Sequence, residues 1–343
     1  MSLAREIAEQ PRVLVRLLAD GGAEARAIGR TLRAAEHLTI AARGSSDNAA
    51  TYGKYLFEGH AGVVTALAAP SLVTRYGTPP GFARGAVIGI SQSGAAPDVA
   101  AVLDAGRSSG ARTIAITNVA RSRVARSADA VLAMRAGPER SVAATKTYTA
   151  TCLALALLAS SCAEARGRDP IPTEGLAEAV EEAVGVGDEA ARLAGRIGRA
   201  RALVILGRGL AYPMALEAAL KVKELARIWA EPYSSADLAH GPIALLGPDT
   251  PAVVMSTRGT VERDARDLAR RLRARGVRVL AITNDERLAE SADGAVLLRA
   301  APHEAMAVIA LVVVAQLLAA ELARRRGLDP DRPTGLTKVT RTR

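Results

Sequence analysis

Short apolar runs alternate with longer amphipathic stretches along the first half of the chain. The apolar runs predict buried strands at residues 37–42, 63–68, 86–90, 112–118 and 130–134. The stretches between several of these runs show helical spacing, and they predict helices over residues 11–33, 98–109 and 144–165. Strands that alternate with helices favour an α/β fold with a doubly wound parallel sheet flanked by helices.

The second half of the chain repeats the plan of the first. Residues 110–118 read GARTIAITN and residues 276–284 read GVRVLAITN, while Ser-Ala-Asp occurs at both 127–129 and 291–293. These pairs share an offset close to 165 residues, which predicts two copies of one α/β unit. We expect N-terminal helices at 1–33, a first domain at 34–166, a helical linker at 167–195, a second domain at 196–328 and a C-terminal tail at 329–343.

Composition indicates a globular protein. Hydrophobic residues make up 49% and charged residues 23% of the chain, and the net charge is +10. The positive charge favours anionic ligands, but it is spread along the chain. Aromatic residues are only 3%, and no nucleic-acid-binding motif is found, so we expect no nucleic acid partner.

Cysteine usage and hydropathy place the protein in the cytoplasm. Cys152 and Cys162 lie in one apolar helical run and are expected to be reduced core residues. The first ten residues are polar and do not resemble a signal peptide. The apolar run 305–320 is short for a membrane span, so we expect a buried core helix and no membrane association.

One strand–turn–helix predicts a phosphate site. The strand at residues 86–90 runs directly into Ser91, Gln92, Ser93 and Gly94, and Pro97 is suited to the first turn of a helix. Uncommitted backbone N–H groups at a helix start, with two hydroxyls and an amide beside them, favour a phosphate. The second copy has Ser-Thr-Arg-Gly at 256–259 instead, so we expect this phosphate cradle in the first copy only.

The second copy carries candidate groups for proton transfer. Lys221 and Glu224 are three residues apart on a predicted helix, so they share one face. His240 lies in a turn before Gly241. Alone, the first pair could be a surface ion pair and the histidine a structural residue. Together they offer a carboxylate base and an imidazole that titrates near neutral pH, which suits proton transfer on a sugar.

Five segments, in order along the chain, carry a family resemblance. They are Gly44-Ser45-Ser46, Ser91-Gln92-Ser93-Gly94, Glu139 with residues 142–146, residues 215–224, and His240-Gly241-Pro242. With them the chain resembles the sugar isomerase (SIS) domain family, and in particular the isomerase half of glucosamine-6-phosphate synthase and the SIS-type glucosamine-6-phosphate deaminases. The resemblance implies two tandem SIS domains over nearly the whole chain.

The resemblance also implies a role for each matching residue. The implied substrate-binding residues are Gly44, Ser45, Ser46, Ser91, Gln92, Ser93, Val142 and Ala143. Glu224 is implied to move a proton between C1 and C2 of the sugar, with support from Lys221 and Glu139. His240 is implied to open the sugar ring from the neighbouring subunit, which requires a homodimer. The tail at 331–340 resembles a segment that closes over the site, where Lys338 can form a Schiff base or serve as a positioned cation.

Departures from the family pattern shape the expected reaction. The sequence lacks the synthase's glutaminase domain, Ala96 stands where the synthase has a phosphate-binding threonine, and Ala144 replaces a serine. We therefore expect a deaminase that converts glucosamine 6-phosphate to fructose 6-phosphate and ammonia, without a metal or redox cofactor. The alternatives are a fructosamine-phosphate deglycase or another aldose–ketose isomerase of this fold, and a non-catalytic regulator that binds sugar phosphates.

Overall fold

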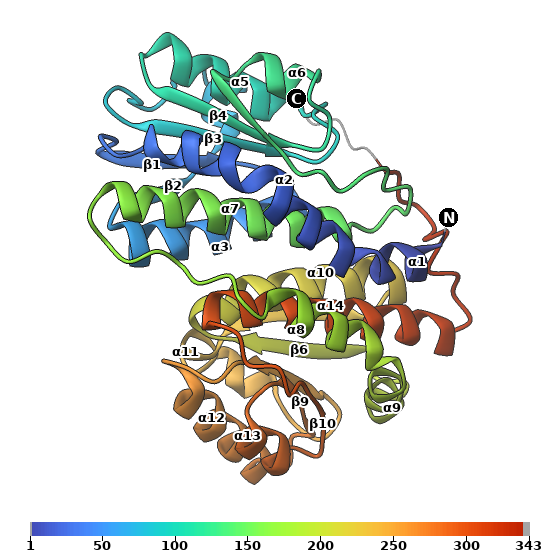
Figure 1. Ribbon diagram of the computed structural model, residues 1–343. Coiled ribbons are helices and arrows are strands. Elements are labelled where there is room, and N and C mark those ends of the chain that lie inside the picture. Colours follow the sequence, from blue (N-terminus) through green and yellow to red (C-terminus); the bar gives the residue numbers. More distant parts are fainter. Residues whose placement is uncertain (1, 339–343) are drawn as a thin grey trace. The chain divides into compact units, whose positions relative to one another are not determined.

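The computed structural model describes residues 2–338 and divides the chain into two compact units (Figure 1). Among the described residues, the first-repeat unit comprises 12–139, 146–171 and 337–338. The second-repeat unit comprises 2–11, 140–145 and 172–336. Each unit is described separately below.

The first-repeat unit holds a five-stranded parallel sheet with the order β2-β1-β3-β4-β5 in its described residues. Its strands are β1 (His37–Ala41), β2 (Val64–Leu67), β3 (Ala86–Ser91), β4 (Arg112–Thr117) and β5 (Ala130–Ala133). Its helices are α2 (Gln10–Arg30), α3 (Ser45–Leu56), the π-helix η1 (Phe57–Ala61), α4 (Pro70–Thr74), α5 (Pro97–Ser108), α6 (Arg123–Arg126) and α7 (Lys146–Ala165). All five predicted strands are present with ends shifted by at most one residue, because apolar runs define them, although β2 is mostly exposed.

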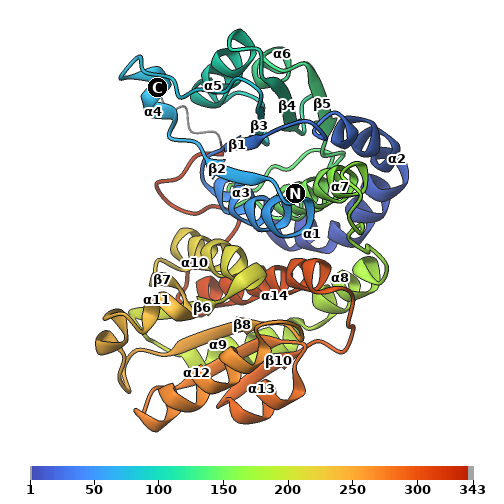
Figure 2. The same cartoon turned by 90° about the vertical axis from the view of Figure 1, so that its left-hand side faces the viewer.

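The second-repeat unit holds a second parallel sheet with the order β10-β9-β8-β6-β7 (Figure 2). Its strands are β6 (Ala202–Gly207), β7 (Trp229–Ser234), β8 (Ala252–Ser256), β9 (Val279–Thr283) and β10 (Gly294–Leu297). Its helices are α1 (Leu3–Ala8), α8 (Leu176–Gly185), α9 (Gly187–Ile197), η2 (Gly209–Ala211), α10 (Tyr212–Ala226), α11 (Ser235–Leu238), η3 (Pro242–Leu245), α12 (Glu262–Ala274), α13 (Glu286–Ser291) and α14 (Glu304–Arg325).

The internal repeat is confirmed by matching strand orders and by matching side-chain contacts. In the first copy, the Asp129 carboxylate accepts a hydrogen bond from the Thr113 N–H at 2.9 Å. In the second copy, the Asp293 carboxylate accepts one from the Val279 N–H at 2.8 Å. Each aspartate thus ties the start of one edge strand to its neighbour, and the Ser-Ala-Asp repeat in the sequence marks this contact.

The two longest apolar helices are core helices. Both α7 and α14 are long and apolar enough to cross a membrane, but most residues of each are buried inside the structure. Helix α7 contacts α3, and α14 contacts α8, α9 and α10. Cys152 and Cys162 lie in α7 as buried thiols that form no disulfide with each other, as expected. Burial inside a protein core accounts for the apolar character of these helices.

Helix α1 lies within the region 1–33 where N-terminal helices were predicted, ahead of the helix that the spacing predicts over residues 11–33. Its six residues are too few for a clear helical period, and most of the surrounding residues are polar. The side chain of Ser2 caps the helix by accepting a hydrogen bond from the Arg5 N–H at 3.3 Å. Leu3 and Ile7 are buried, so tertiary contacts stabilise this short helix.

Candidate functional site

The two serine-containing loops of the first-repeat unit lie side by side at the carboxyl edge of its sheet. Strands β1 and β3 are parallel neighbours, with Ala41 opposite Gly89, so the loops that follow them leave the same edge. The strand order reverses direction between β1 and β3, and ligands of open α/β sheets bind at such a point. The loop after β1 carries Gly44, Ser45 and Ser46, and the loop after β3 carries Ser91, Gln92 and Ser93.

An ion pair and a glycine fix the two loops. Arg43 in the first loop donates from Nε to Asp98 Oδ2 at 2.7 Å, and Asp98 is a buried residue of the first turn of α5. Gly94 has a φ of +64°, and a Cβ there would lie 2.0 Å from Ser122 Oγ. Only glycine fits this position, so the Ser-Gln-Ser-Gly turn is fixed by its own sequence.

The matching loop of the second repeat is occupied by side chains of this chain. After β8, the Arg258 N–H donates to Asn284 Oδ1 at 2.7 Å. The Gly259 N–H donates to Glu262 at 3.2 Å, and the Thr260 N–H donates to Glu304 at 3.3 Å. In the first repeat, no carboxylate of the described residues accepts from the N–H groups of residues 92–94. The backbone N–H groups of the two loops therefore have different partners, and phosphate binding by the first loop stays a prediction.

Glu139 and Lys338 form an ion pair within the first-repeat unit. Lys338 Nζ donates to Glu139 Oε2 at 2.6 Å, although the two residues are 199 positions apart in sequence. The N–H and the hydroxyl of Thr147, in the first turn of α7, also donate to the Glu139 carboxylate at 3.1 and 2.7 Å. The side chain of Glu139 is fully buried, and that of Lys338 is 24% exposed. The structure thus places two predicted site residues in direct contact.

A cavity of 590 Å³ in the first-repeat unit joins the cradle to Glu139. Gln92 and Glu139 both line it, as does Asn118, which follows β4. Arg16 and Arg135 line it as well, and the sequence analysis did not identify either arginine as a site residue. Two arginines among many spread along the chain carry no distinguishing pattern, so only the fold could single them out.

Lys221 and Glu224 form the predicted pair on α10 in the second-repeat unit. Lys221 is 1% exposed, and its Nζ lies 2.5 Å from Glu224 Oε2 and 3.4 Å from Glu217 Oε1. Burial alone would lower the pKa of Lys221, but the two carboxylates outweigh it and raise this pKa above its ordinary value of 10.5. The ammonium therefore stays charged at neutral pH. The Glu224 side chain is 23% exposed, so its carboxylate can reach a ligand.

The remaining predicted residues lie in the second-repeat unit. His240 is exposed in the turn after α11, and its backbone N–H donates to the Asp237 carbonyl at 3.0 Å. Its contribution across a dimer interface stays a prediction. Val142 and Ala143 lie in segment 140–145, which forms neither helix nor strand. The predicted site residues thus fall in two units.

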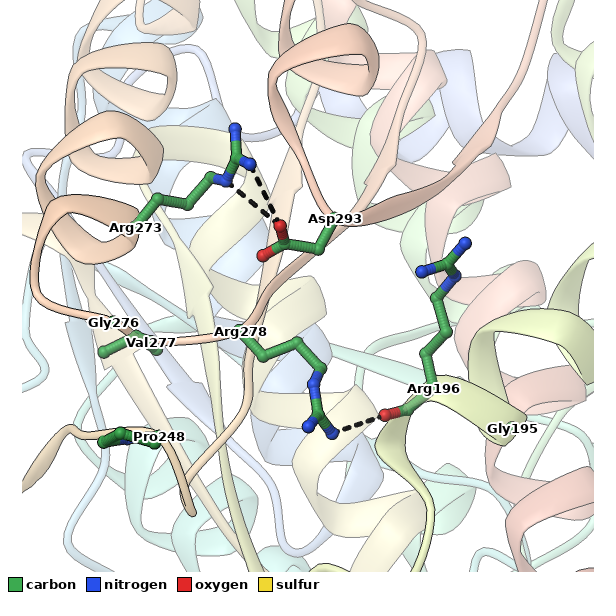
Figure 3. A pocket seen from close by; sticks show the side chains of 8 residues that line it. All are labelled: Gly195, Arg196, Pro248, Arg273, Gly276, Val277, Arg278 and Asp293. Carbon is green, nitrogen blue, oxygen red and sulfur yellow. Dashed lines mark hydrogen bonds and ion pairs between the residues drawn. The ribbon is translucent and has the colours of Figure 1, made fainter.

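The hollow shown in Figure 3 contains fewer candidate site residues than the cavity beside Glu139. It measures 720 Å³ and is lined by three arginines and one aspartate of the second-repeat unit. Asp293 pairs with Arg273 at 3.1 Å, and Arg278 donates to the backbone carbonyl of Arg196 at 2.8 Å. None of the predicted site residues lines it.

Comparison with known proteins identifies the family. The family model for the SIS domain matches residues 31–161 and 197–324, one match for each repeat. The chain belongs to the SIS domain family. The two matches each contain one of the five-stranded sheets, so the tandem SIS architecture expected from the sequence is confirmed.

Relatives of this SIS protein include sugar phosphate enzymes. A glutamine–fructose-6-phosphate aminotransferase (isomerizing) of Pyrococcus horikoshii is 34% identical over 98% of this chain. The chain spans 57–58% of the length of the curated relatives it matches first. The C-terminal domain of a glucosamine-fructose-6-phosphate aminotransferase from Francisella tularensis has 26% identity and a TM-score of 0.82, covering 96% of both chains. A glucosamine-6-phosphate deaminase from Thermotoga maritima shares the fold over 100% of both chains, with a TM-score of 0.80 and 23% identity.

Replacing Ala96 with threonine tests the altered cradle of this SIS protein. Ala96 is the N-cap of α5 and provides no side-chain cap. Pro97 has no N–H and the Val99 N–H already donates to Asp98 Oδ1 at 2.9 Å, so a threonine hydroxyl can accept from the Asp98 N–H. We expect the free energy of unfolding to rise by at most about 1 kcal/mol. We also expect a lower KM for a sugar phosphate. The control is Ala96→Val, which has the same shape without the hydroxyl. An equal change in KM with valine would contradict a role for the hydroxyl.

Proposed function

We propose that this SIS protein is an amino sugar phosphate deaminase that converts glucosamine 6-phosphate to fructose 6-phosphate and ammonia. The observation that carries the proposal is the Lys221–Glu224 pair, a partly exposed carboxylate held 2.5 Å from a buried ammonium. A positioned carboxylate can remove and return a proton on carbon, and the buried ammonium of Lys221 holds this carboxylate in place.

The proposed reaction needs three steps. Ring opening by His240 exposes the C1 aldehyde and the C2 amine. Glu224 then removes the proton from C2 and returns it to C1, while the C1 oxygen gains a proton and the nitrogen loses one, which gives a hydroxyl at C1 and an imine at C2. Water adds to this imine and ammonia leaves, so the ketose phosphate is the second product. The serines and Gln92 of the cradle are proposed to hold the phosphate during these steps.

The two cysteine thiols of this chain are buried. Release of ammonia from glutamine calls for an activated nucleophile such as a thiolate. The two cysteines of the sequence, Cys152 and Cys162, are both buried in α7. Burial raises the pKa of the Cys162 thiol although Arg166 opposes the shift, so this thiol stays protonated at neutral pH. We therefore propose neither thiol as a nucleophile of the reaction.

An ammonia-release assay over a panel of phosphorylated amino sugars tests the proposed function. We expect glucosamine 6-phosphate to be turned over, with equal amounts of ammonia and fructose 6-phosphate. Turnover of a fructosamine phosphate alone would identify a deglycase, and ketose formation without ammonia would identify an aldose–ketose isomerase. Tight binding of a sugar phosphate without any turnover would refute the enzyme and favour a regulator.

Lys338→Met tests the role of the C-terminal segment. The variant removes the cation that lies 2.6 Å from Glu139, while both hydrogen bonds from Thr147 to Glu139 remain. We expect kcat/KM to fall by about 10–100-fold, because a displacement of a site residue by about 1 Å can lower the rate by this factor. The matched control is Lys223→Met, an exposed lysine on α10. Unchanged kcat/KM in Lys338→Met would exclude Lys338 from the site.

A further inference from the structure

Glu6 is a buried carboxylate that the proposed reaction does not use. It lies in the six-residue helix α1 and is 0% exposed. Burial of a carboxylate is costly unless hydrogen bonds compensate for the lost water. The partners of Glu6 therefore explain why an acidic residue is tolerated at this position.

Those partners are two consecutive backbone N–H groups of another segment. The Arg140 N–H donates to Glu6 Oε1 at 2.6 Å, and the Ser141 N–H donates to Glu6 Oε2 at 3.2 Å. Residues 140–145 form neither helix nor strand, so no backbone ladder satisfies these donors. Hydrogen bonds to an ionised acceptor are about twice as strong as neutral ones, so Glu6 fixes the backbone of this segment.

The segment that Glu6 fixes connects residues of the candidate site. Glu139 precedes it directly, and Val142 and Ala143 lie within it. The two hydrogen bonds to Glu6 hold the backbone at the start of this segment, and Val142 and Ala143 follow directly along the chain.

The same helix also anchors the beginning of the C-terminal segment. The Leu3 N–H donates to Asp331 Oδ1 at 2.6 Å, across 328 positions of sequence. Figure 1 shows α1 beside the last part of the second-repeat unit. The chain continues from Asp331 to Lys338. One short helix thus holds two segments that lead to predicted site residues.

We propose that Glu6 is a positioning residue for the candidate site, acting through the backbone of residues 140–145. Helix α1 is then a clamp that sets the 140–145 segment through Glu6 and the start of the C-terminal segment through Asp331. The expected change in kcat/KM rests on the proposed function, whereas the expected change in hydrogen exchange of residues 140–145 does not.

The test compares Glu6→Gln with wild type and with Glu9→Gln. Glutamine keeps one acceptor but turns an NH₂ group toward a backbone donor, so one N–H loses its partner. Glu9 provides a matched control because it is the C-cap residue of the same helix and pairs with Arg5. We expect kcat/KM of Glu6→Gln to fall by about 10–100-fold, as misplacement of binding groups by about 1 Å can cost this much. Hydrogen exchange of residues 140–145 should rise in Glu6→Gln and not in Glu9→Gln.

Several results would overturn the proposal. One is unchanged kcat/KM and unchanged exchange in folded Glu6→Gln. Another is a loss of activity that only matches the fraction of unfolded protein, measured by circular dichroism at the assay temperature. If Glu6→Gln does not fold, Asp331→Ala removes the other contact of α1, the hydrogen bond from the Leu3 N–H. Unchanged kcat/KM in Asp331→Ala would then contradict the proposal.

Failure of the proposed function gives a different result from failure of this inference. If wild type turns over none of the sugars, the Kd of the best-binding sugar phosphate replaces kcat/KM. A weaker Kd in Glu6→Gln, together with faster exchange of residues 140–145, would then support the positioning role. An unchanged Kd would overturn it.

Discussion

Glu224→Gln should reduce kcat at least about 10³-fold, because general acid–base catalysis contributes about 10²–10⁴-fold and glutamine cannot carry the proton. The Kd for the sugar phosphate should change little, since the amide keeps the size of the carboxylate and an acceptor for Lys221. The measurement is the ammonia-release rate at saturating substrate, with Kd from isothermal titration calorimetry.

The control for this experiment is Glu181→Gln. Glu181 is an exposed residue of α8, and the same chemical change there should leave kcat unaltered. If Glu224→Gln retains more than about a tenth of the wild-type kcat, another group must act as the base, because removal of a general base costs far more.

Lys221→Met should have the largest effect on stability. Lys221 is buried beside Glu217, which is itself 0% exposed, and both lie on α10. Removing one partner of a buried ion pair leaves an uncompensated charge, and we expect the free energy of unfolding to fall by about 3–5 kcal/mol. Urea unfolding of the purified variant measures this loss.

A double variant separates stability from catalysis. In Lys221→Met/Glu217→Met the orphaned carboxylate is gone, so most of the lost free energy of unfolding should return. The activity should not return, because Glu224 still lacks the ammonium beside it. Recovery of activity together with stability would show that Lys221 has only a structural role.

The stabilisation by Lys221 also has a defined pH range. The pKa of Lys221 is raised in the folded protein above its ordinary 10.5, so the folded state binds this proton more tightly than the unfolded state does. The contribution of Lys221 is therefore fully present below about 10.5 and is lost as the pH rises through the folded pKa. The difference in unfolding free energy between wild type and Lys221→Met should stay constant from neutral pH up to that point. A decline that begins near neutral pH would contradict this assignment.

The sequence by itself determined the elements and the repeat. Strands of parallel sheets are rich in continuous apolar residues, so β1 to β5 were visible as apolar runs, and the echo of residues 110–118 at 276–284 marked the second copy. The turn at Ser91 to Gly94 was predictable for a similar reason, because its backbone conformation depends on a local glycine. The spacing of Lys221 and Glu224 fixed their shared helix face, and the contact of 2.5 Å follows from that spacing.

Contacts between distant segments were decided only by the tertiary structure. Glu6 meets Arg140, and Leu3 meets Asp331, across separations that leave no periodic signal in the sequence. The filling of the second loop by Glu262 and Glu304 was equally hidden, as was the lining of one cavity by Arg16 and Arg135. The resemblance to the SIS family named Glu139 and Lys338 separately, but only the fold pairs them. Local patterns report the preferences of neighbouring residues, whereas these contacts depend on where the chain returns in space.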